Sequence, residues 1–165
     1  MRSTLRSHAF ALGIAFAMQI PGLAAHAAGT VQVNFVKPET FTDIRDQAFS
    51  RERHLESLKR ILSEVALPYV ADGQTLTVDV LDVDLAGEPK PGARAHDVRV
   101  LRGRADWPRI TLRWALESPG QAPQQGQAVV QDMAYLQRLQ PTQLSGALPY
   151  ERRMLEEWFK TRFGH

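Results

Sequence analysis

The chain has 165 residues, with 20 Lys+Arg, 18 Asp+Glu and no cysteine. The lack of cysteine excludes disulfides, thiolate metal sites, iron–sulfur clusters and a thiol nucleophile. Arg2 and Arg6 fall in a predicted leader, so residues 28–165 carry 18 charges of each sign. This balance gives no reason to expect a nucleic-acid partner.

Residues 1–27 have the pattern of a secretory signal. Arg2 and Arg6 precede an apolar segment at residues 9–20, and the sequence AHA ending at Ala27 places small residues where signal peptidase reads them. We predict cleavage after Ala27 and a periplasmic or secreted location. The apolar segment is too short to cross a bilayer as a stable helix, so we expect no membrane span in the mature chain. Residues 28–165 have the length of one domain.

The first two elements of the mature chain are expected to be a strand and a helix. Residues 31–36 (VQVNFV) alternate between apolar and polar side chains, which indicates a strand. Apolar residues then recur at helical spacing over residues 50–67, with charged residues on the opposite face. Pro68 disfavours helical geometry at the preceding residue, so we place the end of the helix there.

The stretch at residues 74–88 (QTLTVDVLDVDLAGE) is the longest with strand character. It alternates twice, and the two alternations are out of phase at Val80-Leu81. Side chains on a strand switch faces at every residue, so this doublet either reverses the apolar face or marks a β-bulge that restores it. We favour the bulge, because it keeps both apolar sets on one core and re-aims Asp82 and Asp84.

Strands are also expected at residues 97–101, 109–117 and 127–132, followed by a short helical start at 133–139 and a helix at 149–163. The order is β-α-β-β-β-β-α. It predicts an α+β fold with a single antiparallel or mixed sheet of about five strands and two helices packed on one face.

Acidic residues near the 74–88 strand are the strongest candidates for chemistry: Asp79, Asp82, Asp84, Glu88 and Asp97. Crowded carboxylates hold hard divalent cations through oxygen ligands, and a carboxyl with a raised pKa acts as a general acid. The structural alternative is a solvent-facing strand whose acids pair with arginines. The spacing lacks the glycine and distal glutamate of a helix-loop-helix calcium site, so we assign no metal.

A series of arginines follows: Arg94, Arg99, Arg102, Arg104, Arg109 and Arg113. Guanidinium groups bind carboxylates and phosphates through parallel N–H donors. We expect them to form cross-strand ion pairs with the aspartates of the 74–88 strand, with Arg99 and Arg113 on one face of adjacent strands. The alternative is that they bind an anionic ligand or an envelope protein.

No other part of the chain shows a recognisable catalytic pattern. The histidines lack the spacing of zinc ligands, Ser145-Gly146 lacks the surroundings of a nucleophile elbow, and no glycine-rich phosphate loop is present. We therefore assign no catalytic residue, no metal site and no cofactor.

Three segments, LDVDLAGE, DVRVLRGRADWPRITLRW and YERRMLEEWF, occur in this order. In order and spacing they resemble a family of secreted proteins from Gram-negative bacteria catalogued as domain of unknown function 3016 (DUF3016). The segment FVKPETFTDIRD near the start is also similar, so the resemblance covers essentially the whole mature chain. It implies a periplasmic or secreted single domain and no particular activity. The chain departs from the pattern at residues 88–95, which are proline-rich where an aromatic residue is expected.

Two functions remain open from the sequence. The preferred one is a non-enzymatic envelope binding or accessory module that uses a charged sheet face, and a purely structural role in an assembly is not distinguished from it. The alternative is a small carboxylate- or metal-dependent hydrolase that uses Asp82 and Asp84. The candidate binding residues are Asp82, Asp84, Glu88, Asp97, Arg99, Arg102, Arg109 and Arg113.

Overall fold

The structure is a computed structural model that describes residues 28–44, 48–90, 98–138 and 146–164. The strands are β1 (Thr30–Phe35), β2 (Thr75–Asp84), β3 (Glu88–Lys90), β4 (Val98–Val100), β5 (Arg109–Glu117) and β6 (Gln124–Gln131). The helices are α1 (Ala48–Ala66), α2 (Tyr135–Arg138) and α3 (Pro149–Phe163), with 3-10 turns η1 (Pro38–Thr40) and η2 (Leu67–Tyr69).

The main sheet has four strands in the order β1-β2-β5-β6. The β1 and β2 strands are parallel, and the other neighbours are antiparallel, so the sheet is mixed. The parallel pair follows from the chain order, because α1 lies between β1 and β2 and carries the chain back to the starting end. The expected α+β fold with a mixed sheet is thereby confirmed.

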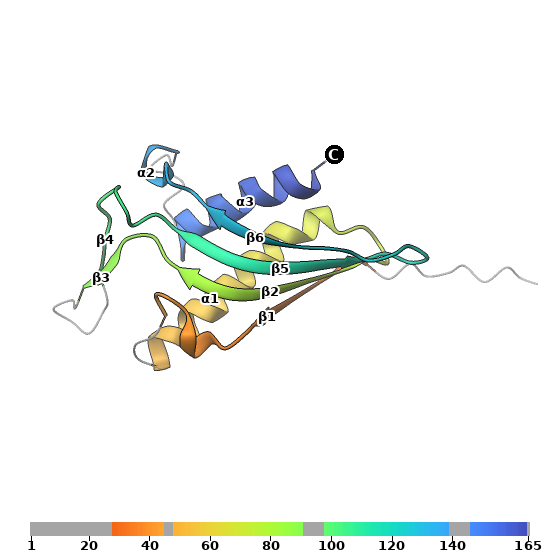
Figure 1. Cartoon of the computed structure of the whole chain (residues 1–165), viewed down its shortest axis with the longest axis horizontal. Helices are drawn as coiled ribbons and strands as arrows, with labels where there is room; N and C mark the ends of the chain where they lie inside the picture. The colour runs from red at the N-terminus through yellow and green to blue at the C-terminus, as the bar shows by residue number, and fades with distance from the viewer. Residues whose placement is uncertain (1–27, 45–47, 91–97, 139–145, 165) are drawn as a thin grey trace, which may run out of the picture.

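The expected strand near residues 97–101 does not join this sheet. The β4 strand pairs with β3 in a separate two-stranded ribbon, which projects beyond one end of the main sheet in Figure 1. Both edges of β2 are already occupied by β1 and β5, so no edge of the central strand is free for β4. Gly87 turns the chain into the ribbon with φ 74°, a left-handed conformation that glycine adopts without steric cost.

Both long helices cover the same face of the main sheet (Figure 1). Strand alternation puts the apolar residues of β2 and β5 beneath them, and Val78, Val80, Ile110 and Leu112 are fully buried. Leu58 and Leu62 of α1 and Leu155 and Phe159 of α3 belong to the same core. An ion pair between Arg152 and Glu64 joins the two helices at the surface.

The predicted bulge in β2 is confirmed. Val80 lies opposite Leu112, but the next pair is Asp82 with Thr111, so Leu81 is the extra residue. The shift returns Val83 to the core, where it lies opposite Ile110 and is fully buried. It also sets Asp82 and Asp84 on the face that the helices leave uncovered.

Several element boundaries differ from the expected ones, among them those of α1 and β6. The α1 helix begins at Ala48 and ends at Ala66, and Leu67 opens the η2 turn that contains Pro68. The β6 strand begins at Gln124, earlier than the predicted residue 127. Residues 124–126 pair with β5 although glutamine and glycine have little strand preference.

Of the helices in the described part of the chain, none is both long and apolar enough to cross a membrane.

Candidate functional site: a charged sheet face

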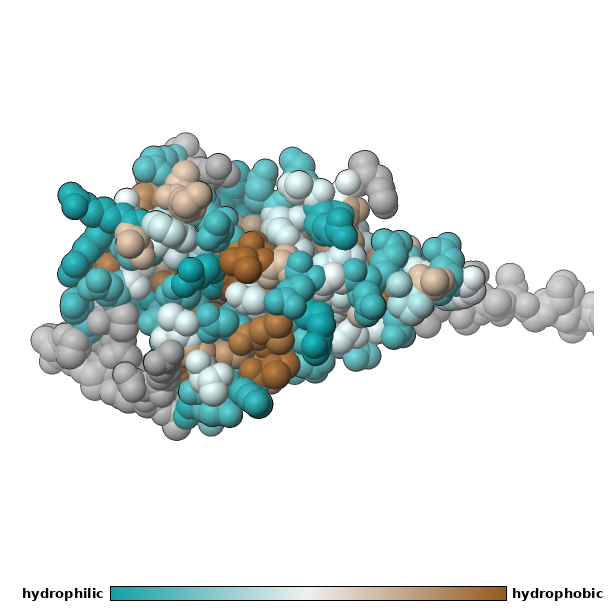
Figure 2. Space-filling view, viewed as in Figure 1, coloured by the Kyte–Doolittle hydropathy of each residue, from teal (hydrophilic) through white to brown (hydrophobic). Residues whose placement is uncertain are grey.

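The candidate site is the face of the main sheet turned away from α1 and α3. Its polar side chains come from β1, β2 and β5, and this set is here called the charged face: Asn34, Thr77, Asp79, Asp82, Asp84, Arg109, Thr111 and Arg113. Figure 2 shows mainly hydrophilic side chains on the viewed side, with hydrophobic groups between them. The charged face lies on paired strands, so its charges are held at fixed spacings.

The centre of the charged face is an ion pair between Asp79 and Arg113, which lie directly opposite each other on β2 and β5. The Arg113 Nη2 atom is 2.7 Å from Asp79 Oδ2, and the Asn34 amide donates to Asp79 Oδ1 at 2.9 Å. The Asn34 hydrogen bond, followed by that of Arg113, holds the pKa of Asp79 below its usual range. Asp79 is therefore ionised and has a donor on each carboxylate oxygen at neutral pH.

A second cross-strand pair joins Asp84, the last residue of β2, to Arg109, the first residue of β5. The Arg109 Nη2 atom is 3.0 Å from Asp84 Oδ2, and the two residues are again direct neighbours in the register. Burial raises the pKa of Asp84, and the positive charge of Arg109 opposes this shift without cancelling it, while Asp43 adds to it. The same ion-pair chemistry thus leaves Asp84 easier to protonate than Asp79.

Asp82 has a structural role that the sequence did not reveal. Its carboxylate accepts hydrogen bonds from the Thr42 backbone N–H at 2.7 Å and from the Thr42 hydroxyl at 2.9 Å. Asp82 therefore ties the loop after β1 to β2. Within the described residues, no group of three or more His, Cys, Asp or Glu side chains is arranged to hold a metal ion.

The prediction that Arg99 and Arg113 share one face is wrong. Arg99 lies on β4, outside the main sheet, where Nε donates to the Ala86 carbonyl at 2.7 Å and Nη2 donates to the Leu85 carbonyl at 3.0 Å. It also donates to the Gly87 carbonyl at 2.5 Å and pairs with Asp43. Arg99 is a structural clamp at the end of β2, and its donors are used within the protein.

The remaining predicted residues lie around this end of the sheet. Glu88 pairs with Arg102 at 3.1 Å and with Lys90 at 3.3 Å, all on exposed side chains. Asp97, like Arg94, falls outside the described residues. The structure therefore brings Asp82, Asp84, Arg109 and Arg113 together on the charged face. It places Glu88 and Arg99 in the ribbon and Arg102 just after it.

A cavity of about 310 Å³ opens where the charged face meets the ribbon. Its lining residues are Asp43, Asp84, Leu85, Gly87, Glu88, Arg102, Arg104, Ala105 and Asp106. Asp106 accepts hydrogen bonds from the backbone N–H groups of Arg102 and Arg104, at 2.5 and 2.9 Å. These bonds outweigh the opposing effect of burial and lower the pKa of Asp106. The cavity thus has carboxylates of different proton affinity and two arginine side chains.

Sequence reasoning missed Glu151, the one charged residue of α3 that is buried among the described residues. It is 2% exposed and accepts a hydrogen bond from the Ala86 backbone N–H at 2.7 Å. Burial raises the pKa of Glu151, and the Ala86 N–H only partly offsets this. Glu151 lies three and four residues before the buried Met154 and Leu155, so it falls on the apolar stripe of α3. This spacing is the sequence signal that could have predicted its burial.

Comparison with protein families gives a match over residues 29–161 to the model described as "Protein of unknown function (DUF3016)". The chain belongs to the DUF3016 family. The match covers most of the chain and includes the whole charged face, the ribbon and nearly all of α3. That description names no activity, and a search of curated proteins finds no match.

Proposed function

We propose that this DUF3016 protein is an exported, non-enzymatic binding or accessory module that engages an envelope protein through the charged face. The observation that carries the proposal is the mixture of charges on the sheet face turned away from α1 and α3. The side chain of Arg113 is 59% exposed and that of Arg109 is 43% exposed, so both guanidinium groups have donors that face solvent while they hold an aspartate.

The alternation of the two signs favours a protein partner over a polyanion. Asp79, Asp82 and Asp84 lie between and beside the two arginines, so a phosphate-rich ligand would meet three carboxylates. A protein surface with its own acidic and basic groups is complementary to such a pattern, and this complementarity provides specificity more than affinity. Export is supported by the leader features at residues 1–27 and by a family match that begins at residue 29.

Site-specific photo-crosslinking tests this proposal. A benzophenone amino acid is placed at Thr77 or Thr111 on the charged face, and at Lys59 on the exposed side of α1 as the control. We expect the two face positions to crosslink one envelope protein in living cells and Lys59 to crosslink none. Arg113→Glu should abolish the crosslinked product. It places a second carboxylate opposite Asp79 and reverses the sign of the charge that the face presents to the partner at this position. Equal crosslinking from all three positions would refute the proposal.

The hydrolase remains the second candidate because Asp84, a carboxyl with a raised pKa, lines the 310 Å³ cavity beside Asp43 and Glu88. Thermal denaturation with Ca²⁺, Mg²⁺, Mn²⁺ or Zn²⁺ tests its metal-dependent form, since a ligand of the folded state raises the melting temperature. The hydrolase predicts a rise that Asp84→Asn removes and that Asp79→Asn, which is not among the lining residues of the cavity, leaves in place. No rise with any of the four ions would eliminate the metal-dependent form.

A further inference from the structure

The β6 strand is one margin of the main sheet. In the described part of the chain its only strand partner is β5, so one row of its backbone N–H and C=O groups has no strand to pair with. Its eight residues, QQGQAVVQ, include no charge and no proline. Natural proteins usually blunt an exposed edge with lysine, proline or a bulge, because an open edge accepts another strand. The β6 edge has none of these features.

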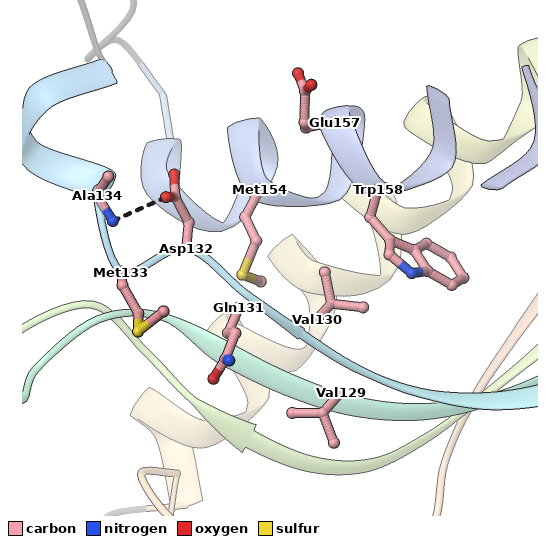
Figure 3. A pocket seen from close by; sticks show the side chains of 9 residues that line it. All are labelled: Val129, Val130, Gln131, Asp132, Met133, Ala134, Met154, Glu157 and Trp158. Atoms are coloured by element: carbon pink, nitrogen blue, oxygen red, sulfur yellow. Dashed lines mark hydrogen bonds between the residues drawn. The ribbon is translucent and has the colours of Figure 1, made fainter. Parts of the chain in front are cut away.

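A groove of about 360 Å³ runs beside the end of this edge, between β6 and α3 (Figure 3). Its lining residues are Val129, Val130, Gln131, Asp132, Met133, Ala134, Met154, Glu157 and Trp158. Val129 is 56% exposed and Met133 is 63% exposed, both unusually high for large apolar side chains. Figure 3 shows the Met154 thioether and the Trp158 indole on the α3 side of the same hollow. Met154 is buried at 3% exposed, whereas the flexible Met133 thioether is open to solvent and adapts to apolar side chains of varied shape.

The charges at this groove have one sign. Glu157 is exposed on α3, and Asp132 lies at the opposite side, where its carboxylate accepts a hydrogen bond from the Ala134 N–H at 3.0 Å. Among the residues that the structure describes, no lysine or arginine lines the groove. A segment that binds here is therefore favoured if it carries a positive side chain next to its apolar ones.

We propose that the β6 edge and this groove form a docking site for an extended, basic peptide segment of a partner protein. The segment adds to β6 as a further strand, so its side chains reach both sides of the sheet. Apolar ones contact Val129 and Met133 on the side away from α3 and Trp158 on the α3 side, and a lysine or arginine lies beside Glu157. This site includes none of the eight residues that define the charged face, although Val129 lies directly opposite Thr111 in the sheet, and it goes beyond the function proposed for that face. A second copy paired through its own β6 fits less well, because that strand has no cation to offer Glu157.

Peptide selection tests the proposal and does not require the partner to be identified first. A library of phage-displayed random peptides is selected on the wild-type chain after depletion on the Met133→Lys/Glu157→Lys double variant. Both substituted side chains are exposed, so the variant keeps the fold. Enriched peptides are synthesised and their affinities are measured by fluorescence anisotropy. Glu156→Lys is the matched control, since Glu156 is exposed on the same helix but does not line the groove.

We expect the enriched peptides to carry apolar residues at neighbouring positions, so that both sides of the added strand are apolar, and to contain lysine or arginine. They should bind the double variant at least tenfold more weakly than the wild type and bind Glu156→Lys equally well. Methylation of alternate backbone nitrogens should abolish binding, because it removes the strand-pairing donors. Failure to enrich any peptide, or equal binding to the double variant, would overturn the proposal. Light scattering of the wild type and the double variant tests the other occupant. If the wild type is a dimer and the double variant is a monomer, the edge binds a second copy, and the proposal is also overturned.

Discussion

Replacement of Arg99 by methionine tests how the end of β2 is held. Arg99 donates to the carbonyl oxygens of Leu85, Ala86 and Gly87 and pairs with Asp43. Its side chain is 21% exposed and that of Asp43 is 12% exposed, so water replaces few of these interactions when the guanidinium is removed. Methionine keeps the aliphatic bulk and removes every donor.

The expected cost follows from what the substitution leaves behind. Removing one partner of a largely buried ion pair costs about 3 to 5 kcal/mol, because the other charge stays buried without compensation. Asp43 keeps the Leu85 N–H, at 3.1 Å, as a donor, which places the expected loss toward about 3 kcal/mol. Changing Asp43 to Asn in the same chain removes the stranded charge, so we expect the double variant to recover part of this loss.

Urea denaturation of the purified protein measures the effect through the free energy of unfolding. The matched control is Arg113→Met, which removes a pair whose arginine side chain is 59% exposed. Exposed pairs contribute about 0 to 1 kcal/mol, so the control should unfold close to the wild type. A loss for Arg99→Met below about 1 kcal/mol, or equal to that of Arg113→Met, would refute the role assigned to Arg99.

Three further predictions address the core, the sheet and the leader. The raised pKa of Glu151 means that folding favours its protonated form, so its contribution is complete below the ordinary glutamate pKa and is lost as pH rises through the raised one. Glu151→Gln should therefore melt higher than the wild type at alkaline pH but not at acidic pH, and Glu157→Gln, at an exposed position of the same helix, is the control. A gain at acidic pH alone would reverse the assigned sign. Gly126→Ala should cost about 1 to 3 kcal/mol in urea denaturation, because the new Cβ would lie 3.0 Å from the Trp114 indole, and a neutral result would contradict that packing. The exported protein should begin at Ala28 by N-terminal sequencing, and an intact leader would contradict the predicted cleavage.

Local pattern predicted much of the main sheet and part of the charged face. The Val80-Leu81 doublet placed the bulge, because side-chain alternation is a property of the strand itself. The pairs of Asp79 with Arg113 and of Asp84 with Arg109 were anticipated in kind, since arginines and aspartates on neighbouring strands meet across a register.

Contacts between segments far apart in the sequence were beyond such patterns. Glu151 meets the Ala86 N–H from 65 positions away, and Asp82 meets Thr42 from 40 positions away. Each contact joins two segments that meet only because whole helices, strands and loops pack together. The sequence around either residue does not specify its partner. Arg99 was misplaced for the same reason, because β4 was expected in the main sheet and the chain instead turned away at Gly87.

By itself the sequence determined the types of the longer elements and the buried side of β2 and β5, and it predicted a leader, because periodicity, breakers and side-chain chemistry are local properties. Tertiary structure alone decided that β6 ends the sheet with an unblunted edge, that a groove forms beside α3, and that Arg99 and Glu151 stabilise the fold from within. The physical reason is that strand order, burial and hydrogen-bond partners are fixed only when distant segments compete for the same edge and the same core.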